Sequence, residues 1–240
     1  MKRSLPRAVL LDLDDTILDD SGRVDRCWRE ACAAHVSELP GVDAAAVFDA
    51  IHKASRWFWG DPDRHRAGRL DLHNARREVV RLAFRRLAIS RIAVADKIAD
   101  SYSHRRDEGM EPLPEAVDTV RWLRGSGCRL ALLTNGAGPA QRTKILRFGL
   151  AQLFETILVE GELGFGKPDE RIYRLALERL DVAPSEAWMI GDNLEWDVAS
   201  PQRLGLFTIW IDVRGSGLPR TASVRPDRIV RALSELRSTR

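Results

Sequence analysis

The sequence predicts an α/β protein: a Rossmann-like parallel sheet with an all-helical domain inserted after the first strand. Three observations lead to this prediction. An apolar run at Ala8–Leu11 ends in acidic residues, the segment that follows has helical periodicity, and the remainder alternates short apolar runs with amphipathic helices. We therefore expect residues 1–18 and 111–240 to form the core and residues 19–110 to form a helical insert.

The first expected strand is the run AVLL at Ala8–Leu11. A strand that is apolar at every position is typical of a parallel sheet that is buried on both faces. The acidic residues that follow, beginning with Asp12, then lie at the carboxyl end of the strand. Ligands of open α/β sheets bind outside that end, so we expect the functional site there.

The inserted segment carries four expected helices. Apolar side chains recur along it every three to four residues, in stripes that begin near Val24, Val47, Leu72 and Val94. The stretch Asp61–Asp71, between the second and third helices, is rich in charge and is expected to be a loop. No part of the insert has a convincing strand pattern.

The stretch EPLPE marks a linker and the start of a helix, after which strands and helices alternate as in a parallel sheet. The expected strands lie at 129–133, 156–159, 187–190 and 207–211. The expected helices lie around 116–124, 140–147, 170–180, 198–204 and 229–236.

Composition limits the class of protein and of partner. The chain has 240 residues, of which 44% are hydrophobic and 30% charged, as in ordinary soluble globular proteins. The formal net charge of +3 is scattered among acids, which favours a small anionic substrate over nucleic acid. Three cysteines without metal-finger spacing indicate free thiols.

No apolar run is long enough to span a membrane, and the segment MKRSLPR leads into a strand rather than a signal-peptide apolar region. We expect a cytoplasmic protein, monomeric or homodimeric, without a membrane partner.

Polar side chains follow three of the expected strands, where the carboxyl ends of parallel strands meet at one edge of the sheet. Converging carboxylates with a lysine and a hydroxyl suit a Mg²⁺ ion that holds a phosphate. Taken one at a time, Lys167 would be an exposed lysine before a helix and Asp15 or Asp197 a capping carboxylate, whereas a carboxylate directly after a buried strand needs a partner. The residues are Asp12, Asp14, Asp15, Thr16, Thr134, Asn135, Lys167, Asp192 and Asp197.

Four short motifs follow one another in the chain: DLDDT at 12–16, LLTNG at 132–136, GKP at 166–168 and GDNLEWD at 191–197. They resemble the DxDxT loop, the Ser or Thr after the second strand, the Lys and the acidic GDxxxxD loop of phosphatases of the haloacid dehalogenase superfamily. Each motif alone is weak evidence, but four in this order span nearly the whole chain. The last motif is most similar to the branch of pyrimidine nucleotidases and N-acylneuraminate phosphate phosphatases.

The resemblance implies a phosphohydrolase of small phosphate monoesters, such as nucleotide or sugar phosphates. It implies that Asp12 is the nucleophile and takes the phosphoryl group as an aspartyl phosphate. Asp14 would be the general acid and base. Thr134 would hydrogen-bond the phosphoryl oxygens, and Lys167 would neutralise Asp12 and the charge in transfer.

The same resemblance implies Mg²⁺ as cofactor. Its ligands would be Asp12, Asp192 and the backbone carbonyl of Asp14. Asp197 completes the metal loop and is better suited to orient a metal-bound water than to touch the ion. The phosphate-binding loops would be supported by Thr16 and Asn135.

The insert matches in position the helical C1 cap of this superfamily, which covers the site, excludes water and selects the leaving group. Within the expected loop, Arg64, Arg66 and Arg69 adjoin the aromatic run Trp57–Trp59. We expect at least one of these arginines, or His65 among them, to contact the leaving group of the substrate. The alternative is that they form weak ion pairs with neighbouring acids on a solvated surface.

Three other functions are compatible with parts of this pattern. A haloacid dehalogenase would use Asp12 to displace halide but needs neither a metal nor an acid at Asp14. A sugar phosphomutase would pass the phosphoryl group to a sugar instead of water. A non-catalytic binding module would be expected to lack a motif residue, and none is missing here.

Overall fold

The computed structural model describes residues 4–239. Contacts divide the chain into two compact units, one holding the residues up to Asp19 with those from Glu111 onward, the other holding Asp20–Met110. The first is built around a sheet and the second consists of helices. Each unit has its own hydrophobic core, made of residues from that unit alone.

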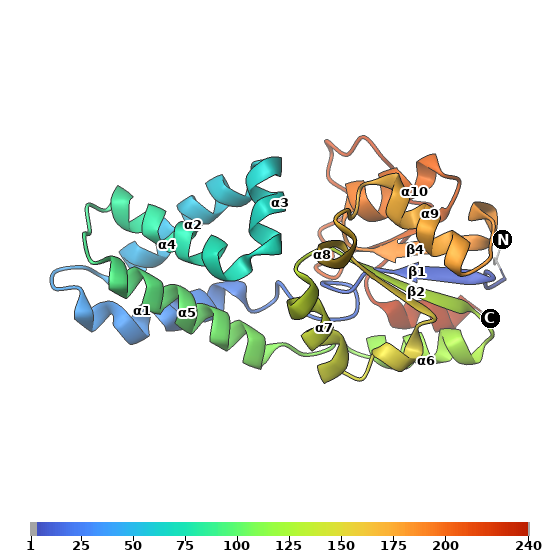
Figure 1. The fold of residues 1–240 in the computed structure, drawn as a ribbon, viewed down its shortest axis with the longest axis horizontal. Helices are drawn as coiled ribbons and strands as arrows, with labels where there is room; N and C mark the ends of the chain where they lie inside the picture. The colour runs from blue at the N-terminus through green and yellow to red at the C-terminus, as the bar shows by residue number, and fades with distance from the viewer. Residues whose placement is uncertain (1–3, 240) are drawn as a thin grey trace. The chain divides into compact units, whose positions relative to one another are not determined.

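The larger unit contains a six-stranded sheet in which neighbouring strands are parallel (Figure 1). The strand order is β3-β2-β1-β4-β5-β6, so the first strand of the chain lies inside the sheet. The predicted α/β class and Rossmann-like parallel sheet are therefore confirmed. The strands are β1 (Ala8–Leu11), β2 (Arg129–Thr134), β3 (Thr156–Val159), β4 (Ala187–Gly191), β5 (Phe207–Ile211) and β6 (Arg228–Val230).

Strand β1 lies between β2 and β4, and all four of its residues are apolar and fully buried. An apolar residue at every position is what a strand inside a parallel sheet requires. Leu11 pairs with Leu132 on β2 and with Ile190 on β4. The three strands run in the same direction, so the segments that follow them leave the sheet at one edge. That edge receives the residues of the first, second and fourth motifs.

Helices cover both faces of the sheet. Leu10, Leu133 and Met189 share one core cluster with α9 (Glu170–Arg179), whereas α6 (Ala116–Gly125) lies on the opposite face (Figure 1). The other helical segments of this unit are α7 (Gly138–Arg147), α8 (Glu160–Leu163), α10 (Ser200–Arg203), the π-helix η4 (Leu194–Ala199), and the 3₁₀ segments η2 (Ala151–Leu153), η3 (Pro184–Glu186) and η5 (Leu233–Thr239).

The inserted unit is a bundle whose core comes mainly from the apolar stripes of four helices. Trp28 and Tyr102 stack with ring centroids 3.6 Å apart and an interplanar angle of 5°, which joins the first helix to the last. Along the described chain, no helix has both the length and the apolarity needed to cross a membrane. The helices are α1 (Val24–His35), η1 (Val36–Glu38), α2 (Ala44–Trp59), α3 (Pro62–Leu70), α4 (Leu72–Arg86) and α5 (Ile92–Gly109).

The prediction of a loop at Asp61–Asp71 is wrong, since most of this stretch forms α3. Asp61 caps the helix by accepting the backbone N–H of Arg64 at 2.9 Å, and Pro62 occupies the first turn, where proline is tolerated. Gly68 lets the helix pack closely on the aromatic rings of α2. The helix was missed because it has too few apolar residues to form a stripe.

The helix expected around 229–236 is also wrong. Residues 228–230 form β6, which pairs with β5 at the edge of the sheet, and a 3₁₀ segment follows at Leu233–Thr239. A strand of three residues is too short to show an alternating pattern, so neighbouring apolar positions gave a false helical stripe.

Candidate active site

Asp12, the first residue after β1, is held on both sides of its carboxylate. Its backbone N–H donates to the carbonyl of Ile190 at 3.0 Å, which fixes the residue at the edge of the sheet. The Nζ of Lys167 donates to Oδ1 at 2.6 Å, and the hydroxyl of Thr16 donates to Oδ2 at 3.2 Å. Asp12 is only 7% exposed, so its carboxylate has a well-defined orientation.

Lys167 reaches the site from the loop before α9 and is almost fully buried. Its Nζ donates to Oδ1 of Asp197 at 2.6 Å as well as to Asp12. Asn135 holds the backbone of Lys167: its Nδ2 donates to the carbonyl at 2.7 Å, and its Oδ1 accepts the N–H at 2.8 Å. Lys167 is therefore a buried cation between two aspartates, not the exposed lysine of the alternative interpretation.

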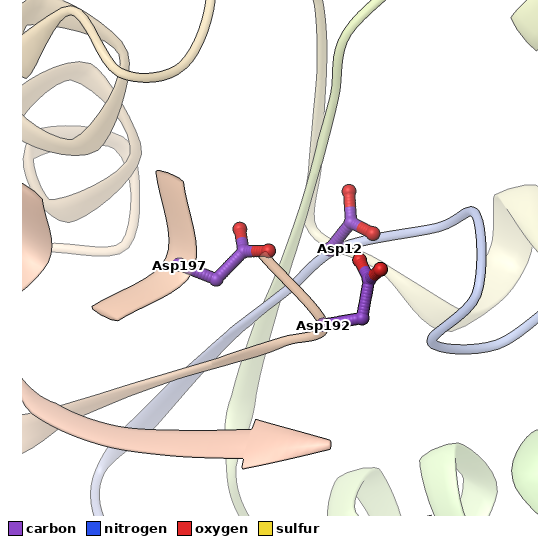
Figure 2. A group of neighbouring side chains, drawn as sticks. All are labelled: Asp12, Asp192 and Asp197. Atoms are coloured by element: carbon purple, nitrogen blue, oxygen red, sulfur yellow. The ribbon is translucent and has the colours of Figure 1, made fainter. Parts of the chain in front are cut away.

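Three carboxylates converge beside this lysine: Asp12, Asp192 and Asp197 each offer an oxygen within 4.8 Å of the others. Figure 2 shows the carboxylates of Asp12 and Asp192 side by side, with that of Asp197 directed toward them. Within residues 4–239, the carboxylate of Asp192 has no hydrogen-bond or ion-pair partner. An unpaired, largely buried carboxylate next to a second one is a place for a cation.

The electrostatics of the cluster agree with this interpretation. Burial, reinforced by Asp197, raises the pKa of Asp12 to about 7 despite the ion pair with Lys167. Burial and the charge of Asp12 raise the pKa of Asp192 to about 8. The pKa of Lys167 is raised by Asp12 and Asp197, which outweigh its burial. Three carboxylates face one ammonium, so a further positive charge would stabilise their ionised forms.

Asp197 is fully engaged by protein groups and lies in the π-helix η4. Its Oδ1 accepts from Lys167, and its Oδ2 accepts the backbone N–H of Asn193 at 3.0 Å. Gly191 is required beside it, because a Cβ on that residue would collide with the carboxylate of Asp197. These contacts favour an orienting role for Asp197 over direct metal ligation.

Asp14 lies apart from the carboxylate cluster and contacts α7. Lys144 Nζ donates to its two oxygens at 2.8 and 2.9 Å, and Gln141 Nε2 donates to Oδ2 at 2.9 Å. The same Gln141 amide donates to the hydroxyl of Thr134, which is buried at the end of β2. The predicted acid, the predicted phosphate-binding hydroxyl and two unpredicted residues thus form one hydrogen-bonded group.

Sequence reasoning missed Gln141 and Lys144. Neither belongs to a motif, but they are three residues apart on the first helix after β2 and therefore share one helix face. That spacing, directly after a motif strand, is the one hint of them in the sequence, and polar residues that face solvent show the same spacing.

The three insert arginines that were predicted to contact substrate all lie in α3. The guanidinium of Arg64 lies 3.7 Å from the centroid of the Trp57 ring, donates to the Trp57 carbonyl at 2.7 Å and pairs with Asp61. Arg69 contacts His65 Nδ1 at 3.2 Å, and Arg66 is exposed. Their contact with a substrate stays a prediction, as do the phosphate-binding roles of Thr16 and Asn135.

A family model described as haloacid dehalogenase-like hydrolase matches residues 6–205. The chain belongs to this family. Among curated relatives, the phosphoserine phosphatase of Thermus thermophilus is 32% identical over 96% of this chain and 97% of its own length. The glyceraldehyde 3-phosphate phosphatase of Methanopyrus kandleri is 26% identical, over 85% of this chain and 83% of its own length.

Solved structures of the haloacid dehalogenase family share the fold. A 2-haloacid dehalogenase from Pseudomonas syringae has a TM-score of 0.62 and 26% identity, and the HAD-hydrolase YfnB from Bacillus subtilis has a TM-score of 0.73 and 22% identity. Each comparison covers 98% of both chains. The sequence relatives named above are phosphatases, and this chain belongs to the haloacid dehalogenase family. It is therefore a hydrolase of phosphoric monoester bonds.

Proposed function

We propose that this protein is a Mg²⁺-dependent phosphohydrolase that forms an aspartyl phosphate on Asp12. The observation that carries the proposal is the largely buried cluster of Asp12, Asp192 and Asp197, in which Lys167 binds the first and the last of the three carboxylates. A nucleophilic carboxylate must be ionised and fixed in direction. Lys167 and Thr16 fix the direction of the Asp12 carboxylate, and Lys167 together with a bound cation would favour its ionised form.

The residues fit a hard divalent cation. Asp12 and Asp192 would hold it through their carboxylates and Asp14 through its backbone carbonyl, while Asp197 would orient a water on it. Oxygen donors with few carboxylates match the preference of Mg²⁺. The bound ion would neutralise charge on the phosphoryl oxygens during transfer.

The protein residues account for the bonds and protons of two transfers. In the first, an oxygen of Asp12 bonds to phosphorus as the ester oxygen leaves, and Asp14 gives that oxygen a proton. In the second, Asp14 takes a proton from water as the water oxygen bonds to phosphorus and the bond to Asp12 breaks. Lys167 and Thr134 would stabilise the charge on the transferred group.

The substrates would be small phosphorylated metabolites. The relatives named above act on phosphoserine and on glyceraldehyde 3-phosphate, both small polar alcohols in phosphorylated form. We assign the insert as a cap that selects the leaving group, with the arginines of α3 as candidate contacts.

A 2-haloacid dehalogenase is the second candidate, because a solved enzyme of that name shares the fold at 26% identity. Displacement of halide needs the nucleophile Asp12 but no acid for an oxygen leaving group. The unpaired Asp192 and the held carboxylate of Asp14 have no use in that reaction.

The test is hydrolysis of 4-nitrophenyl phosphate with and without Mg²⁺. Wild-type protein should release phosphate, EDTA should abolish the activity, and added Mg²⁺ should restore it. Asp12→Asn should abolish turnover while the circular dichroism spectrum stays that of the wild type. Wild-type turnover in Asp12→Asn would falsify the covalent mechanism, and turnover that EDTA leaves unchanged would exclude the metal.

A further inference from the structure

The carboxylate of Asp14 is held by one face of α7. Lys144 contacts both of its oxygens and Gln141 contacts Oδ2, all within 2.9 Å. These contacts join parts of the chain 127 and 130 residues apart. Both donors lie outside the four motifs, whereas the acceptor Asp14 belongs to the first.

We propose that Gln141 and Lys144 are positioning residues that fix Asp14 for proton transfer. The inference rests on the proposed function, since it assumes that Asp14 gives a proton to the leaving oxygen and takes one from water. The two residues touch Asp14 and not the reacting phosphorus, so they would act through the placement of its carboxylate.

Asp14 needs such support because its surroundings do not fix it otherwise. It lies in the loop after β1, and its side chain is 27% exposed, in contrast to the buried Asp12. The terminal torsion of an aspartate is broad, so an exposed carboxylate rotates freely unless donors hold it. A proton donor that is misplaced by about 1 Å costs about 10²-fold in rate.

Gln141 is itself fixed, which makes it an effective support. It is 2% exposed, and its amide nitrogen bridges Asp14 and the hydroxyl of Thr134. One buried amide therefore sets the distance between the predicted acid and the predicted phosphate-binding hydroxyl. Lys144 lies three residues further along α7, on the same face, and its Nζ contacts both oxygens of the Asp14 carboxylate.

The alternative role for Lys144 is direct neutralisation of the phosphoryl group, as proposed for Lys167. The two roles differ in the step that they affect. Formation of the aspartyl phosphate from an aryl ester with a good leaving group requires no proton from Asp14. Its hydrolysis by water requires Asp14 as the base whatever the leaving group was.

The test is a single-turnover experiment with enzyme in excess over 4-nitrophenyl phosphate. Nitrophenolate absorbance reports formation of the aspartyl phosphate, and a phosphate sensor reports its hydrolysis. In Lys144→Met, nitrophenolate release should keep the wild-type rate while phosphate release slows about 10²-fold, the cost of a misplaced catalytic group. With an alkyl phosphate both steps should slow.

The controls separate positioning from folding and from charge. Gln141→Met, a second variant of similar volume, should show the same split, and Lys144→Arg should recover part of the phosphate-release rate. Arg147→Met removes an exposed cation from the same helix and should behave as wild type. Thermal unfolding should confirm that each variant is folded.

The outcomes distinguish a positioning role of Lys144 from a direct role at the phosphoryl group. Equal slowing of both signals in Lys144→Met would assign Lys144 to the phosphoryl group, and unchanged signals would remove it from the mechanism; either result overturns the inference and leaves the phosphatase function intact. A wild-type protein that releases no phosphate would instead overturn the proposed function and this inference with it.

Discussion

Asp12 and Asp14 are two residues apart, yet their carboxylates lie in different surroundings. Asp12 is buried between Lys167 and Thr16, whereas Asp14 is partly exposed and contacts Lys144. A buried, oriented carboxylate suits attack on phosphorus, and one with access to solvent suits proton exchange with water. The environments thus match the two roles that the motif implies.

Replacing Asp14 separates the phosphatase from the dehalogenase. Asp14→Asn should lower kcat on an alkyl phosphate by about 10²- to 10⁴-fold, the usual contribution of general acid-base catalysis, with little change in thermal stability. Steady-state kinetics with phosphate detection measure the effect. Halide release from 2-haloacids by the wild type, without phosphate release from any ester, would overturn the phosphatase assignment.

The carboxylate cluster should make stability depend on pH when the metal is absent. The pKa values of Asp12 and Asp192 are raised to about 7 and about 8, whereas both are near 4 in an unfolded chain. Between these values the folded state binds more protons than the unfolded state, so its stability falls as pH rises.

In EDTA, we therefore expect Tm to be lower at pH 8 than at pH 6. Mg²⁺ binds the ionised carboxylates of the native state, so the rise in Tm on adding it should be larger at pH 8. Differential scanning calorimetry measures both effects, and Asp192→Asn should remove the Mg²⁺-dependent rise. An equal rise at the two pH values would contradict the raised pKa values.

The site residues that could be predicted from the sequence are those at the carboxyl ends of strands. Asp12 and Asp192 directly follow strands, and Thr134 ends one, whose apolar runs are plain in the sequence. Gln141 and Lys144 were not, because an isolated polar residue on a helix has the same pattern whether it faces solvent or a carboxylate. Only the fold, which brings α7 against the loop after β1, distinguishes the two cases.

At the level of elements, buried parallel strands were easier to predict than short polar helices. The strands β3 and β5 have the expected bounds, since apolar runs flanked by turns are distinctive. The helix α3 was predicted as a loop because charged residues dominate it, and its start was indicated only by the capping Asp61 and by Pro62.

The structure of α3 changes the expectation for its three arginines. Arg64 is engaged by Trp57 and Asp61, so Arg64→Ala should lower the stability of the insert. Arg66 is exposed on the same helix and is the stronger candidate for a contact with the leaving group. We expect Arg66→Ala to lower kcat/KM on the best metabolite by about tenfold or more, the loss of a charge-assisted hydrogen bond.

The measurement for α3 compares a screened metabolite phosphate with 4-nitrophenyl phosphate in the Ala variants of Arg64, Arg66 and Arg69. A contact with the leaving group should impair only the metabolite reaction. Wild-type kinetics on both substrates in all three variants would mean that α3 is only a charged surface.

At the scale of the whole molecule, the two units have separate cores, so a lesion in one should not unfold the other. Trp28 is 4% exposed and stacks on Tyr102 within the insert. Trp28→Ala should destabilise the insert by about 3–5 kcal/mol, the range for an aromatic residue truncated in a core.

Hydrogen exchange followed by mass spectrometry measures this effect by segment. In Trp28→Ala, peptides of Asp20–Met110 should exchange faster, while those of β1 and β4 keep the wild-type protection. Faster exchange throughout both units would show that they unfold as one cooperative body.

The central place of β1 has a consequence for synthesis. This strand pairs with β2 and β4, which begin at Arg129 and Ala187, so the ribosome completes the apolar run and Asp12 long before either neighbour exists. Sheet formation must wait while the insert is made, and closing so long a separation slows folding. During that interval the nascent chain carries an unpaired apolar strand, the kind of segment that chaperones protect from aggregation.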